Sequence, residues 1–341
     1  MKKTVLLTAF LFLTSGLAGQ AGAAKTVYLL DWIVFGKHAP FFAAQDKGFY
    51  KKVGLDVEYR RGFGSGRTIT DLASKVGDIG FADAGSLVNA RANNPGIKIK
   101  EVAMIHAKTI MMAFFLKEKG YKTPKDLVGA RIGSPVANAN RVVFPALAAA
   151  NGFSADDVKW VDMPYGQVTP SMLAGRIDVG LWFATEMPVQ QAAAKKIGKE
   201  IGFFSYGDWG VQIYNNGIIA REDTIESNPD FVRNVVKANM EAWAWSLIHL
   251  DEAIEGFRKH APGLSDPIVR GQLAITIDYL FDEGVKQHGL GYIDHQKMDN
   301  TIERLTKLQN LKRRVPTKDL YTNRFLPQWP AIKAVLGDKA M

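Results

Sequence analysis

The sequence predicts an α/β protein built from two similar lobes, and three observations carry this prediction. The chain of 341 residues is longer than one hydrophobic core usually serves, and its 47% apolar and 23% charged residues are typical of a soluble globular protein. Short β-rich runs alternate with segments of helical apolar spacing. A segment near residue 75 recurs about a hundred residues later, as two lobes of one design would require.

Residues 1–23 are expected to be an export signal rather than part of the fold. Lys2 and Lys3 precede an apolar run over 4–13, and small residues of the A-x-A type end the segment at Ala23. The apolar run is shorter than the roughly 20 residues that span a bilayer, which argues against a membrane anchor. We therefore expect cleavage after Ala23 and a mature protein in the periplasm of a double-membraned bacterium.

The first half of the mature chain is predicted to alternate between strands and helices. Short β-rich or alternating runs predict strands at 26–30, 56–60, 78–81, 101–106 and 111–116. Apolar residues at helical spacing predict helices at 40–48, 67–76 and 84–93. This order is typical of a parallel sheet covered by helices.

A second α/β set follows, and the chain then becomes helical. The second set has predicted strands at 131–133, 159–162 and 179–183 and predicted helices at 141–151 and 168–174. After an apolar run at 218–220, helical spacing predicts helices at 231–249, 251–260, 267–281 and 298–308.

An internal repeat relates the two sets. Residues 72–80 recur, one residue shorter, as 173–180, and in each copy a helix ends near a glycine and leads into a short buried strand. Two similar lobes would give this repeat, and chance similarity at a common helix-to-strand turn is the alternative. Lobes lying side by side would place the carboxyl ends of their strands around a shared cleft for a small ligand.

Composition and motifs exclude several kinds of site. The chain has no cysteine, which excludes disulfides, thiolate metal sites and cysteine nucleophiles. The six histidines share no ligand spacing with carboxylates, and neither H-E-x-x-H nor G-x-S-x-G occurs, so we predict no metal and no catalytic residue. The glycine-rich segment 62–66 lacks the G-x-G-x-x-G pattern, so we expect no cofactor.

The charge of the chain does not point to nucleic acid. Loss of the signal removes two lysines and no acid, which lowers the formal net charge from +9 to +7. The basic residues are interspersed with acidic ones over most of the chain, and an exported protein rarely meets nucleic acid. We therefore expect a small-molecule ligand rather than a nucleic-acid partner.

Short motifs spread over nearly the whole mature chain are similar to those of one known family. They are Asp31-Trp32, His38-Ala39-Pro40, 44–50, 54–57, 77–80, 124–129, 178–180, Glu186-Met187-Pro188 and 321–327. In this order they resemble the NMT1/THI5-like family of periplasmic solute-binding proteins, which includes binders of thiamine pyrimidine precursors, riboflavin, sulfonates, taurine and nitrate. The branch that handles pyrimidine precursors is the most similar, at Asp31-Trp32, His38 and Glu186.

The resemblance implies a type II periplasmic-binding-protein fold, in which two parallel-sheet lobes are joined by two crossover strands and close over a ligand. The crossovers would lie near 114–117 and 217–221, and the C-terminal helices would return to the first lobe. The expected organisation is a signal peptide at 1–23, a first lobe at 24–116 plus 221–341, and a second lobe at 117–220.

Three residues combine a position at a strand end with clear binding chemistry. Trp32 follows the first strand, and its ring is expected to lie against a flat ligand, with packing inside the lobe as the alternative. Trp182 ends a strand of the second lobe, and Glu186 follows in the next turn. The Glu186 carboxylate would accept hydrogen bonds from the amino group and the protonated ring nitrogen of an aminopyrimidine. A carboxylate at a helix start is the alternative interpretation.

The other expected ligand-binding residues rest on less specific patterns. Ser65, Gly66 and Ser86 lie near helix starts and would offer N–H groups to an anion. His38 is expected to hydrogen bond in the cleft, with a packed core histidine as the alternative. Loops of the second lobe contribute the last group, in which helix capping is the alternative for the asparagine: Asn138, Tyr165, Asp208 and Trp209.

The function predicted from these features is capture of a small flat heteroaromatic ligand, of the thiamine pyrimidine precursor type, for delivery to the membrane permease of an ABC importer. The same role with an aliphatic sulfonate, taurine, nitrate or another small organic anion is the first alternative, since Arg67 and Arg141 are available to an anion. We expect a monomer. A ligand-binding sensor domain is the second class of function, but such a domain is normally tethered to a membrane, and the sequence shows no second apolar stretch of spanning length.

An enzyme is the remaining alternative, and it comes from the resemblance alone. The same branch includes eukaryotic pyrimidine synthases that consume an active-site histidine, and His38 would be that residue here. Those enzymes share a cysteine-rich segment, whereas this chain has no cysteine and carries an expected export signal. We therefore expect a binding protein and not an enzyme.

Overall fold

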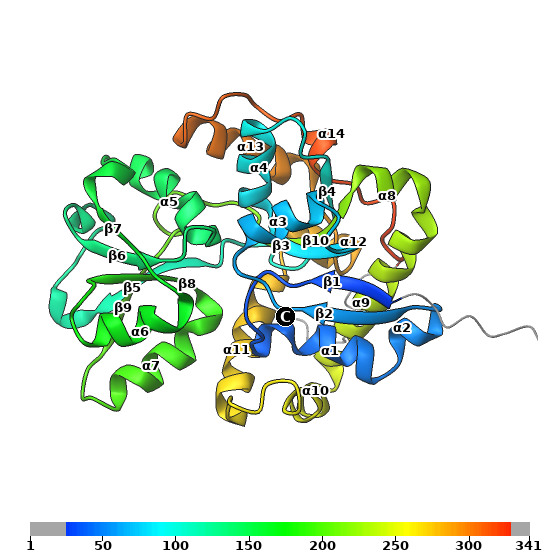
Figure 1. The fold of residues 1–341 in the computed structure, drawn as a ribbon, viewed down its shortest axis with the longest axis horizontal. Coiled ribbons are helices and arrows are strands. Elements are labelled where there is room, and N and C mark those ends of the chain that lie inside the picture. The colour runs from blue at the N-terminus through cyan, green and yellow to red at the C-terminus, as the bar shows by residue number, and fades with distance from the viewer. Residues whose placement is uncertain (1–24, 329–341) are drawn as a thin grey trace, which may run out of the picture.

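The computed structural model describes residues 25–328, which form two lobes lying side by side (Figure 1). Each lobe has one five-stranded sheet with helices packed around it, so the predicted two-lobed α/β fold is confirmed. The predicted export signal, residues 1–23, lies outside the described residues and stays a prediction. Within residues 25–328 no helix has both the length and the apolar character needed to cross a membrane.

The sheet of the first lobe has the strand order β2-β1-β3-β10-β4. Its strands are β1 (Lys25–Leu29), β2 (Asp56–Arg60), β3 (Ile79–Asp83), β4 (Ile99–Met104) and β10 (Asn216–Arg221). All five residues of β3 are buried, as expected for the middle strand of a sheet that is covered on both faces. Its N-terminal helices are α1 (Ala39–Asp46), α2 (Phe49–Lys52), α3 (Ser65–Ala73) and α4 (Ala84–Asn93).

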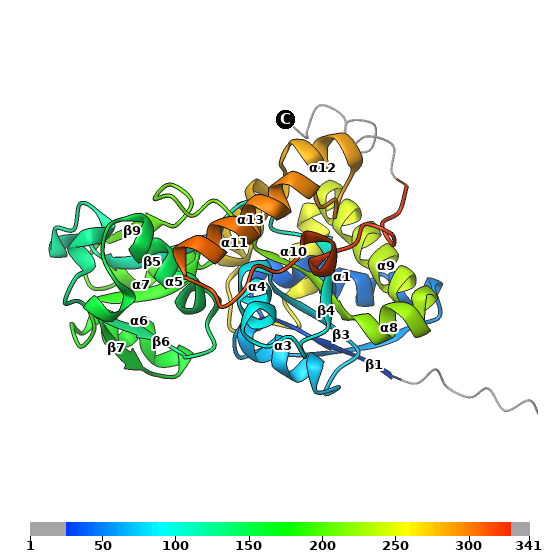
Figure 2. The same ribbon diagram turned by 90° about the horizontal axis from the view of Figure 1, so that it is seen from above.

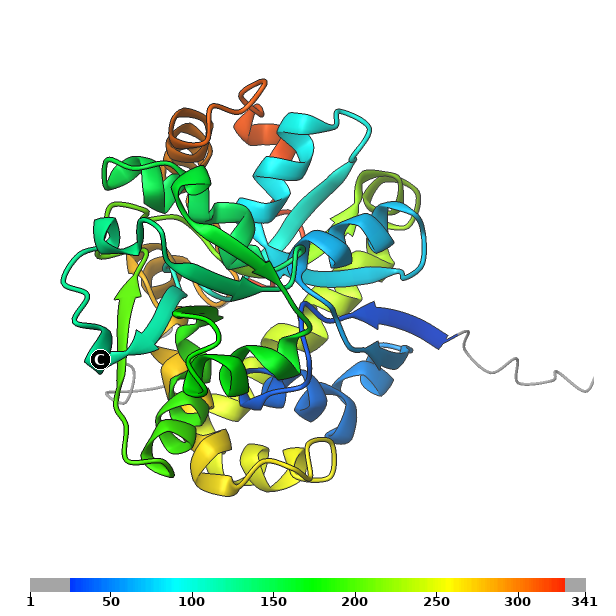
Figure 3. The ribbon, with the colours of Figure 1, turned by 60° about the vertical axis from the view of Figure 1, so that its left-hand side comes forward.

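The second lobe repeats this plan with the order β7-β6-β8-β5-β9, and it comes forward in Figure 3. Its strands are β5 (Met111–Leu116), β6 (Arg131–Ser134), β7 (Lys159–Asp162), β8 (Val179–Phe183) and β9 (Ile201–Ser205). Its helices are α5 (Ala139–Ala150), α6 (Tyr165–Leu173) and α7 (Met187–Lys195). Position by position, the two sheets therefore have the same topology.

The fourth strand of each sheet arrives from the other lobe. β10 pairs antiparallel with β3 and β4, and β5 pairs antiparallel with β8 and β9, whereas the other pairs are parallel. Each sheet is thus mixed rather than purely parallel. The reason is geometric, because a strand that enters from the neighbouring lobe starts at the carboxyl edge of the parallel strands and runs against them.

The lobes are connected by segments 105–110 and 206–215, which precede β5 and β10. The sequence placed the changes of lobe at residues 116 and 220. Backbone pairing instead puts β5 in the second sheet and β10 in the first, so both changes come a few residues earlier. The sequence of an apolar strand does not indicate which sheet the strand will join. The backbone hydrogen bonds decide its place.

The internal repeat corresponds to the same turn in both lobes. In each copy the helix is followed by a left-handed residue, Lys75 with φ 61° and Gly175 with φ 70°. The aspartate three residues later, Asp78 or Asp178, accepts a hydrogen bond from a backbone N–H of the neighbouring strand at 2.7 and 2.9 Å. This aspartate fixes each turn to the adjacent strand, β1 or β6.

The C-terminal helices pack on the first lobe, and two of them also reach the second (Figure 2). They are α8 (Glu222–Ser227), α9 (Pro229–Ile248), α10 (Leu250–Phe257), α11 (Asp266–Leu280), α12 (Glu283–His288), α13 (His295–Leu308) and α14 (Thr317–Leu320). α11 packs against a turn of the first lobe, Gly36–His38, and against α7 of the second. α13 contacts α4 in one lobe and α5 in the other.

The two connecting segments are hydrogen bonded to each other. The hydroxyl of Thr109 donates to the carbonyl of Val211 at 2.9 Å and accepts from the N–H of Ile213 at 2.7 Å. The side-chain oxygen of Asn215 accepts from the N–H of Ile110. The segments therefore form one connected hinge between the lobes.

Glu101 on β4 is an acidic residue in the interior of the first lobe. Its side chain is fully buried, and neither carboxyl oxygen has a hydrogen-bond partner among the described residues. Burial raises the pKa of Glu101 well above its usual range, so folding favours the protonated carboxyl group. In the unfolded chain it ionises above about pH 4.3, so its contribution to stability is full below that pH and falls as the pH rises.

We expect Glu101→Gln to remove this pH dependence. The stability difference between variant and wild type should grow by up to about 1.4 kcal/mol for each pH unit above pH 5, in favour of the variant. Thermal unfolding of both proteins from pH 4 to pH 8 measures it, with Glu226→Gln on the exposed face of α8 as the control. Parallel stability curves for Glu101→Gln and wild type would show that Glu101 is not a buried neutral acid.

Candidate functional site

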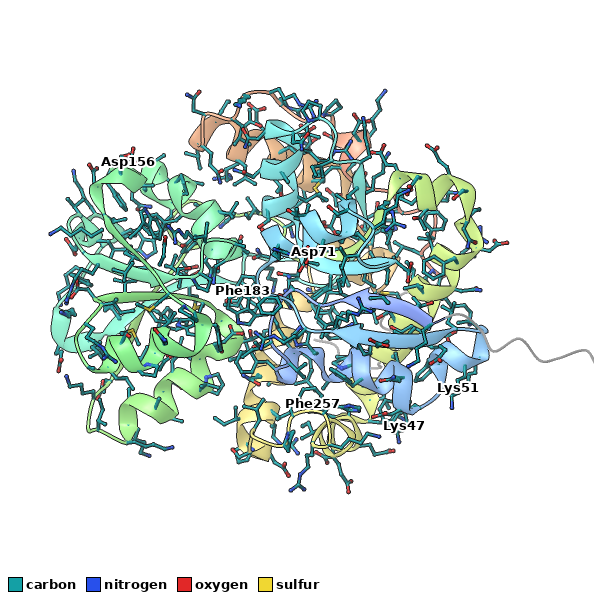
Figure 4. All side chains as sticks on the ribbon, in the orientation of Figure 1. Lys47, Lys51, Asp71, Asp156, Phe183 and Phe257 are labelled. Carbon is teal, nitrogen blue, oxygen red and sulfur yellow. The ribbon has the colours of Figure 1, made fainter. Side chains whose placement is uncertain are left out.

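A small cavity, of about 20 Å³, lies between the lobes at the carboxyl ends of β1, β6 and β8. The first lobe contributes the segments after β1 and β2, and the second lobe contributes those after β6 and β8. This is the position at which parallel strands of α/β proteins present ligand-binding groups. The lining residues are Asp31, Trp32, Lys37, Gly64, Ser65, Asn138, Ala139, Asn140, Trp182, Phe183 and Glu186. Figure 4 shows Phe183 at the boundary between the lobes.

Aromatic rings from both lobes meet beside the cavity. The ring of Tyr165, at the start of α6, lies 4.9 Å from that of Trp32 and 4.4 Å from that of Trp182, with interplanar angles of 83° and 84°. These edge-to-face contacts are the arrangement that aromatic quadrupoles favour. Tyr165 therefore links a tryptophan of the first lobe to one of the second. The indole N–H of Trp182 is buried without a partner among the described residues.

On the side of the first lobe, the cavity is bordered by a buried cluster of charged and polar residues around Asp31. Its carboxylate accepts hydrogen bonds from Lys37 Nζ at 2.7 Å, from His38 Nε2 at 2.9 Å and from the side-chain amide of Asn216 at 2.9 Å. Burial alone would raise the pKa of Asp31, but the positive charge of Lys37 and the His38 hydrogen bond together hold it well below its usual range. Asp31 is thus an ionised carboxylate in the protein interior.

His38 acts as a support for Asp31 in this structure. Its side chain is completely buried and does not line the cavity. Nδ1 accepts from the N–H of Phe35 at 3.1 Å, so Nε2 carries the proton that Asp31 accepts. Burial lowers the pKa of His38, which agrees with a neutral ring. Both ring nitrogens are engaged, as in the packed-histidine alternative.

Glu186 lines the cavity from the second lobe. It ends the short helix Ala184–Glu186, directly before α7, and is 2% exposed. One carboxyl oxygen accepts from the hydroxyl of Thr185 at 3.0 Å. Burial raises the pKa of Glu186 to about 7, although the charge of Lys37 acts in the opposite direction. Glu186 is therefore a group that gains or loses a proton near neutral pH beside the cavity.

Asn138 and Ser65 line the cavity and also belong to helix starts. The side-chain oxygen of Asn138 caps α5 by accepting from the N–H of Asn140 at 2.8 Å, so the capping interpretation also describes the geometry. Ser65 is the first residue of α3. Gly66 lies next to the cavity, where its N–H donates to the carbonyl of Ala137 at 3.3 Å. This bond joins the two lobes directly.

Three expected residues lie away from this cavity. Ser86 donates from its N–H and its hydroxyl to Asp83, which caps α4. Asp208 lines a separate hollow formed by the connecting segments with α11 and α13. Trp209 packs on Phe204 at 5.7 Å between ring centroids. The segment before β10 was expected near the ligand, but its residues belong to the hinge.

The cavity also contains residues that the sequence did not single out for binding. They are Asp31, Lys37, Gly64, Ala139, Asn140 and Phe183. Asp31 had a usable signal, because a polar residue directly after a buried strand lies at the carboxyl edge of the sheet. Lys37 had none, since a lysine in a loop is exposed in most proteins and only its contact with Asp31 explains its burial.

Solved structures that are similar to this chain include proteins with the periplasmic binding protein fold. The alkanesulfonate-binding protein SsuA of Xanthomonas axonopodis pv. citri, solved with MOPS, matches with a TM-score of 0.68 and 13% identity, over 89% of this chain and 99% of that chain. The fold thus places the protein among two-lobed proteins of periplasmic-binding-protein type, with the cavity between the lobes.

The chain belongs to the NMT1/THI5-like family, whose model matches residues 36–253. It is 27% identical to the riboflavin-binding protein RibY of Chloroflexus aurantiacus over 317 residues, which cover 90% of this chain and 88% of that protein. It is 24% identical to the formylaminopyrimidine-binding protein of Halalkalibacterium halodurans over 326 residues, which cover 93% and 97%. The expected family is confirmed, and both relatives are binding proteins.

Closure of the lobes depends on the absence of a side chain at Gly64. Its backbone has φ 113°, and a Cβ there would lie 2.2 Å from the carbonyl oxygen of Ala137 in the other lobe. That oxygen belongs to the backbone, so no side-chain rotation relieves the overlap. A Cβ on Gly66 would lie 3.4 Å from the same oxygen, an ordinary contact.

We expect Gly64→Ala to keep the lobes apart and Gly66→Ala to leave them closed. Small-angle X-ray scattering of the ligand-free proteins should give a larger radius of gyration for Gly64→Ala than for wild type or Gly66→Ala. The positive φ at Gly64 should also cost about 1–3 kcal/mol of stability, measured by denaturant unfolding. Equal radii for all three proteins would show that the Gly64 contact does not limit closure.

Proposed function

We propose that the protein is a periplasmic solute-binding protein that captures a small flat heteroaromatic compound of the pyrimidine type and delivers it to the permease of an ABC importer. The observation that carries this proposal is the inter-lobe cavity, which Trp32 and Trp182 line together with a buried carboxyl group, Glu186, while Tyr165 packs against both tryptophans. Aromatic rings bind flat ligands, and Glu186 supplies the acceptor for ring and amino hydrogens. Membership of the family and the binding-protein relatives support the same role.

The lobes lie so close together in this structure that the cavity holds only about 20 Å³, against the roughly 300–1,000 Å³ that is typical of sites for drug-sized molecules. A ligand of either size therefore requires the lobes to move apart. The choice of a pyrimidine over a flavin rests instead on Glu186, whose carboxyl group matches the adjacent donors of an aminopyrimidine. Among the named relatives, the formylaminopyrimidine-binding protein therefore provides the more suitable model for the ligand.

The polar groups of the cavity disfavour a small anion, which is the alternative ligand class. Glu186 and the unpaired side-chain oxygen of Asn140 require donors from a ligand, whereas a sulfonate or nitrate offers only acceptors. Of the cavity-lining residues in the described part of the chain, the one cation is Lys37, and its charge is already balanced by Asp31. An anion would therefore add a net negative charge beside Glu186.

The histidine-consuming synthase is the other alternative, and the environment of His38 disfavours it. The ring is fully buried, and both nitrogens are held by the protein. A residue that supplies its own atoms to a product needs contact with the other reactant. The proposed function is therefore binding without catalysis. The proposal also includes a monomeric protein and a cognate permease.

Tryptophan fluorescence of the mature protein tests the ligand class directly. The panel is formylaminopyrimidine, its parent aminopyrimidine, riboflavin, an aliphatic sulfonate, taurine and nitrate. A saturable response to the pyrimidines and a weaker one or none to the anions supports the proposal. A response to the sulfonate alone would overturn the heteroaromatic ligand and leave the importer role to the alternative.

We expect Glu186→Gln to separate the two ligand classes. Loss of a charge-assisted acceptor should weaken an aminopyrimidine by about 10–100-fold, whereas a sulfonate should bind equally well or better. Calorimetry on the variant and wild type measures both affinities, with Glu226→Gln as a control outside the site. Equal weakening of the two ligands would contradict the role of Glu186.

The pH dependence of binding should follow from the pKa of Glu186, which burial raises to about 7. Glu186 is protonated below pH 7, and the bound pair of carboxyl group and aminopyrimidine ring holds one proton between them. Above pH 7 the free protein has lost that proton, so binding must take one up. The dissociation constant of wild type should therefore rise up to about tenfold per pH unit above 7, and that of Glu186→Gln should stay flat.

A further inference from the structure

Lys37 is a buried ammonium group for which the features described so far provide no function beyond its ion pair. It lies in the turn Gly36–His38, is 1% exposed and borders the cavity. An ammonium group has three N–H donors, and burial leaves unpaired donors costly. Asp31 accepts one of them at 2.7 Å, and no second acceptor for Lys37 lies among residues 25–328. The rest of its donor capacity is thus available at the cavity.

The surroundings of Lys37 hold the charge in place without using its other donors. Asp31 also accepts hydrogen bonds from His38 and Asn216, so it is shared among three donors and serves Lys37 with one bond. Across the lobe boundary, the ring of Phe183 lies 4.7 Å from Lys37 Nζ, at cation–π distance. An aromatic face stabilises the charge but accepts no strong hydrogen bond. Lys37 is therefore fixed, charged and incompletely paired.

The turn that carries Lys37 is fixed from outside the cavity. The N–H of Gly36 donates at 2.7 Å to the side-chain oxygen of Gln272, which is fully buried on α11. A Cβ on Gly36 would lie 2.8 Å from the carbonyl oxygen of Val269 and 2.9 Å from Gln272, so the turn has no room to shift towards α11. This close packing gives Lys37 a defined place opposite the second lobe.

We propose that Lys37 is a ligand-recognition residue that donates a hydrogen bond to a carbonyl-type acceptor on the ligand, while Glu186 receives the ligand's donors. This inference rests on the proposed function and narrows its ligand class. The ligand is a heterocycle with donors at one edge and an uncharged acceptor substituent at the other. A formylamino group provides that acceptor, whereas the amine left by its removal has no carbonyl oxygen to accept a hydrogen bond from Lys37.

A structural role for Lys37, limited to neutralising Asp31, is the competing explanation. Lys37→Met removes the ammonium and keeps the length of the side chain, but it also leaves Asp31 without its counter-ion, and this alone can unfold the protein. The double variant Asp31→Asn with Lys37→Met removes both charges together. Lys47→Met is the matched control, because Lys47 also pairs with a carboxylate and lies 4.6 Å from the Trp245 ring, but outside the cavity.

The test is calorimetric binding of formylaminopyrimidine and of its deformylated amine to wild type, the double variant and Lys47→Met, with melting temperatures measured in parallel. We expect wild type and Lys47→Met to prefer the formylated compound at least tenfold. The double variant should fold, bind the formylated compound about 10–100-fold more weakly and lose most of this preference.

Two results would overturn the inference, and they are distinguishable. A folded double variant that binds the formylated compound with the affinity and preference of wild type would reduce Lys37 to the counter-ion of Asp31, and the proposed function would stand. Wild-type protein that binds neither pyrimidine would overturn the proposed pyrimidine ligand and the role of Lys37 with it.

Discussion

The buried carboxylate of Asp31 is the constraint on which the rest of the site depends. An ionised carboxylate in the protein interior is tolerated only where donors replace its water, and here three donors do so. Two come from the turn after β1, and the third, Asn216, is the first residue of β10. The strand that returns from the second lobe is therefore tied to the binding turn of the first. Site and hinge share one set of hydrogen bonds.

The two lobes contribute different chemistry to the cavity. The first lobe supplies Lys37, whose charge Asp31 balances, whereas the second supplies Glu186 and the indole N–H of Trp182, which has no partner among the described residues. Closure brings Lys37 near Glu186 and removes water from both, which is why burial dominates the pKa of Glu186. A ligand that satisfies the second-lobe groups compensates for this desolvation. The division explains how an inter-lobe site can favour closure around a suitable ligand.

Local pattern predicted the strands and the binding positions that directly follow them, but not the residues whose burial depends on distant partners. Trp32, Trp182 and Glu186 were identifiable because they follow or end apolar strand segments, and the cavity contains all three. Lys37 was not, since its burial requires Asp31, which in turn requires Asn216, 185 residues further along the chain. Trp209 was expected at the ligand but packs on Phe204 instead. A tryptophan in a loop has the same local sequence pattern in a hinge as in a binding site.

The hydrogen bonds between the connecting segments determine the mechanics of the molecule. Thr109 and Asn215 join the two segments side by side, so neither can bend or twist without the other. Two connecting segments without contact to each other would allow the lobes to slide and rotate in several directions. Two hydrogen-bonded segments favour rotation about a single hinge axis. Each ligand that binds then drives the same trajectory and produces the same closed outline. A partner that reads this outline needs no contact with the ligand. In the importer role proposed above, one permease surface would then serve every ligand that the cavity accepts.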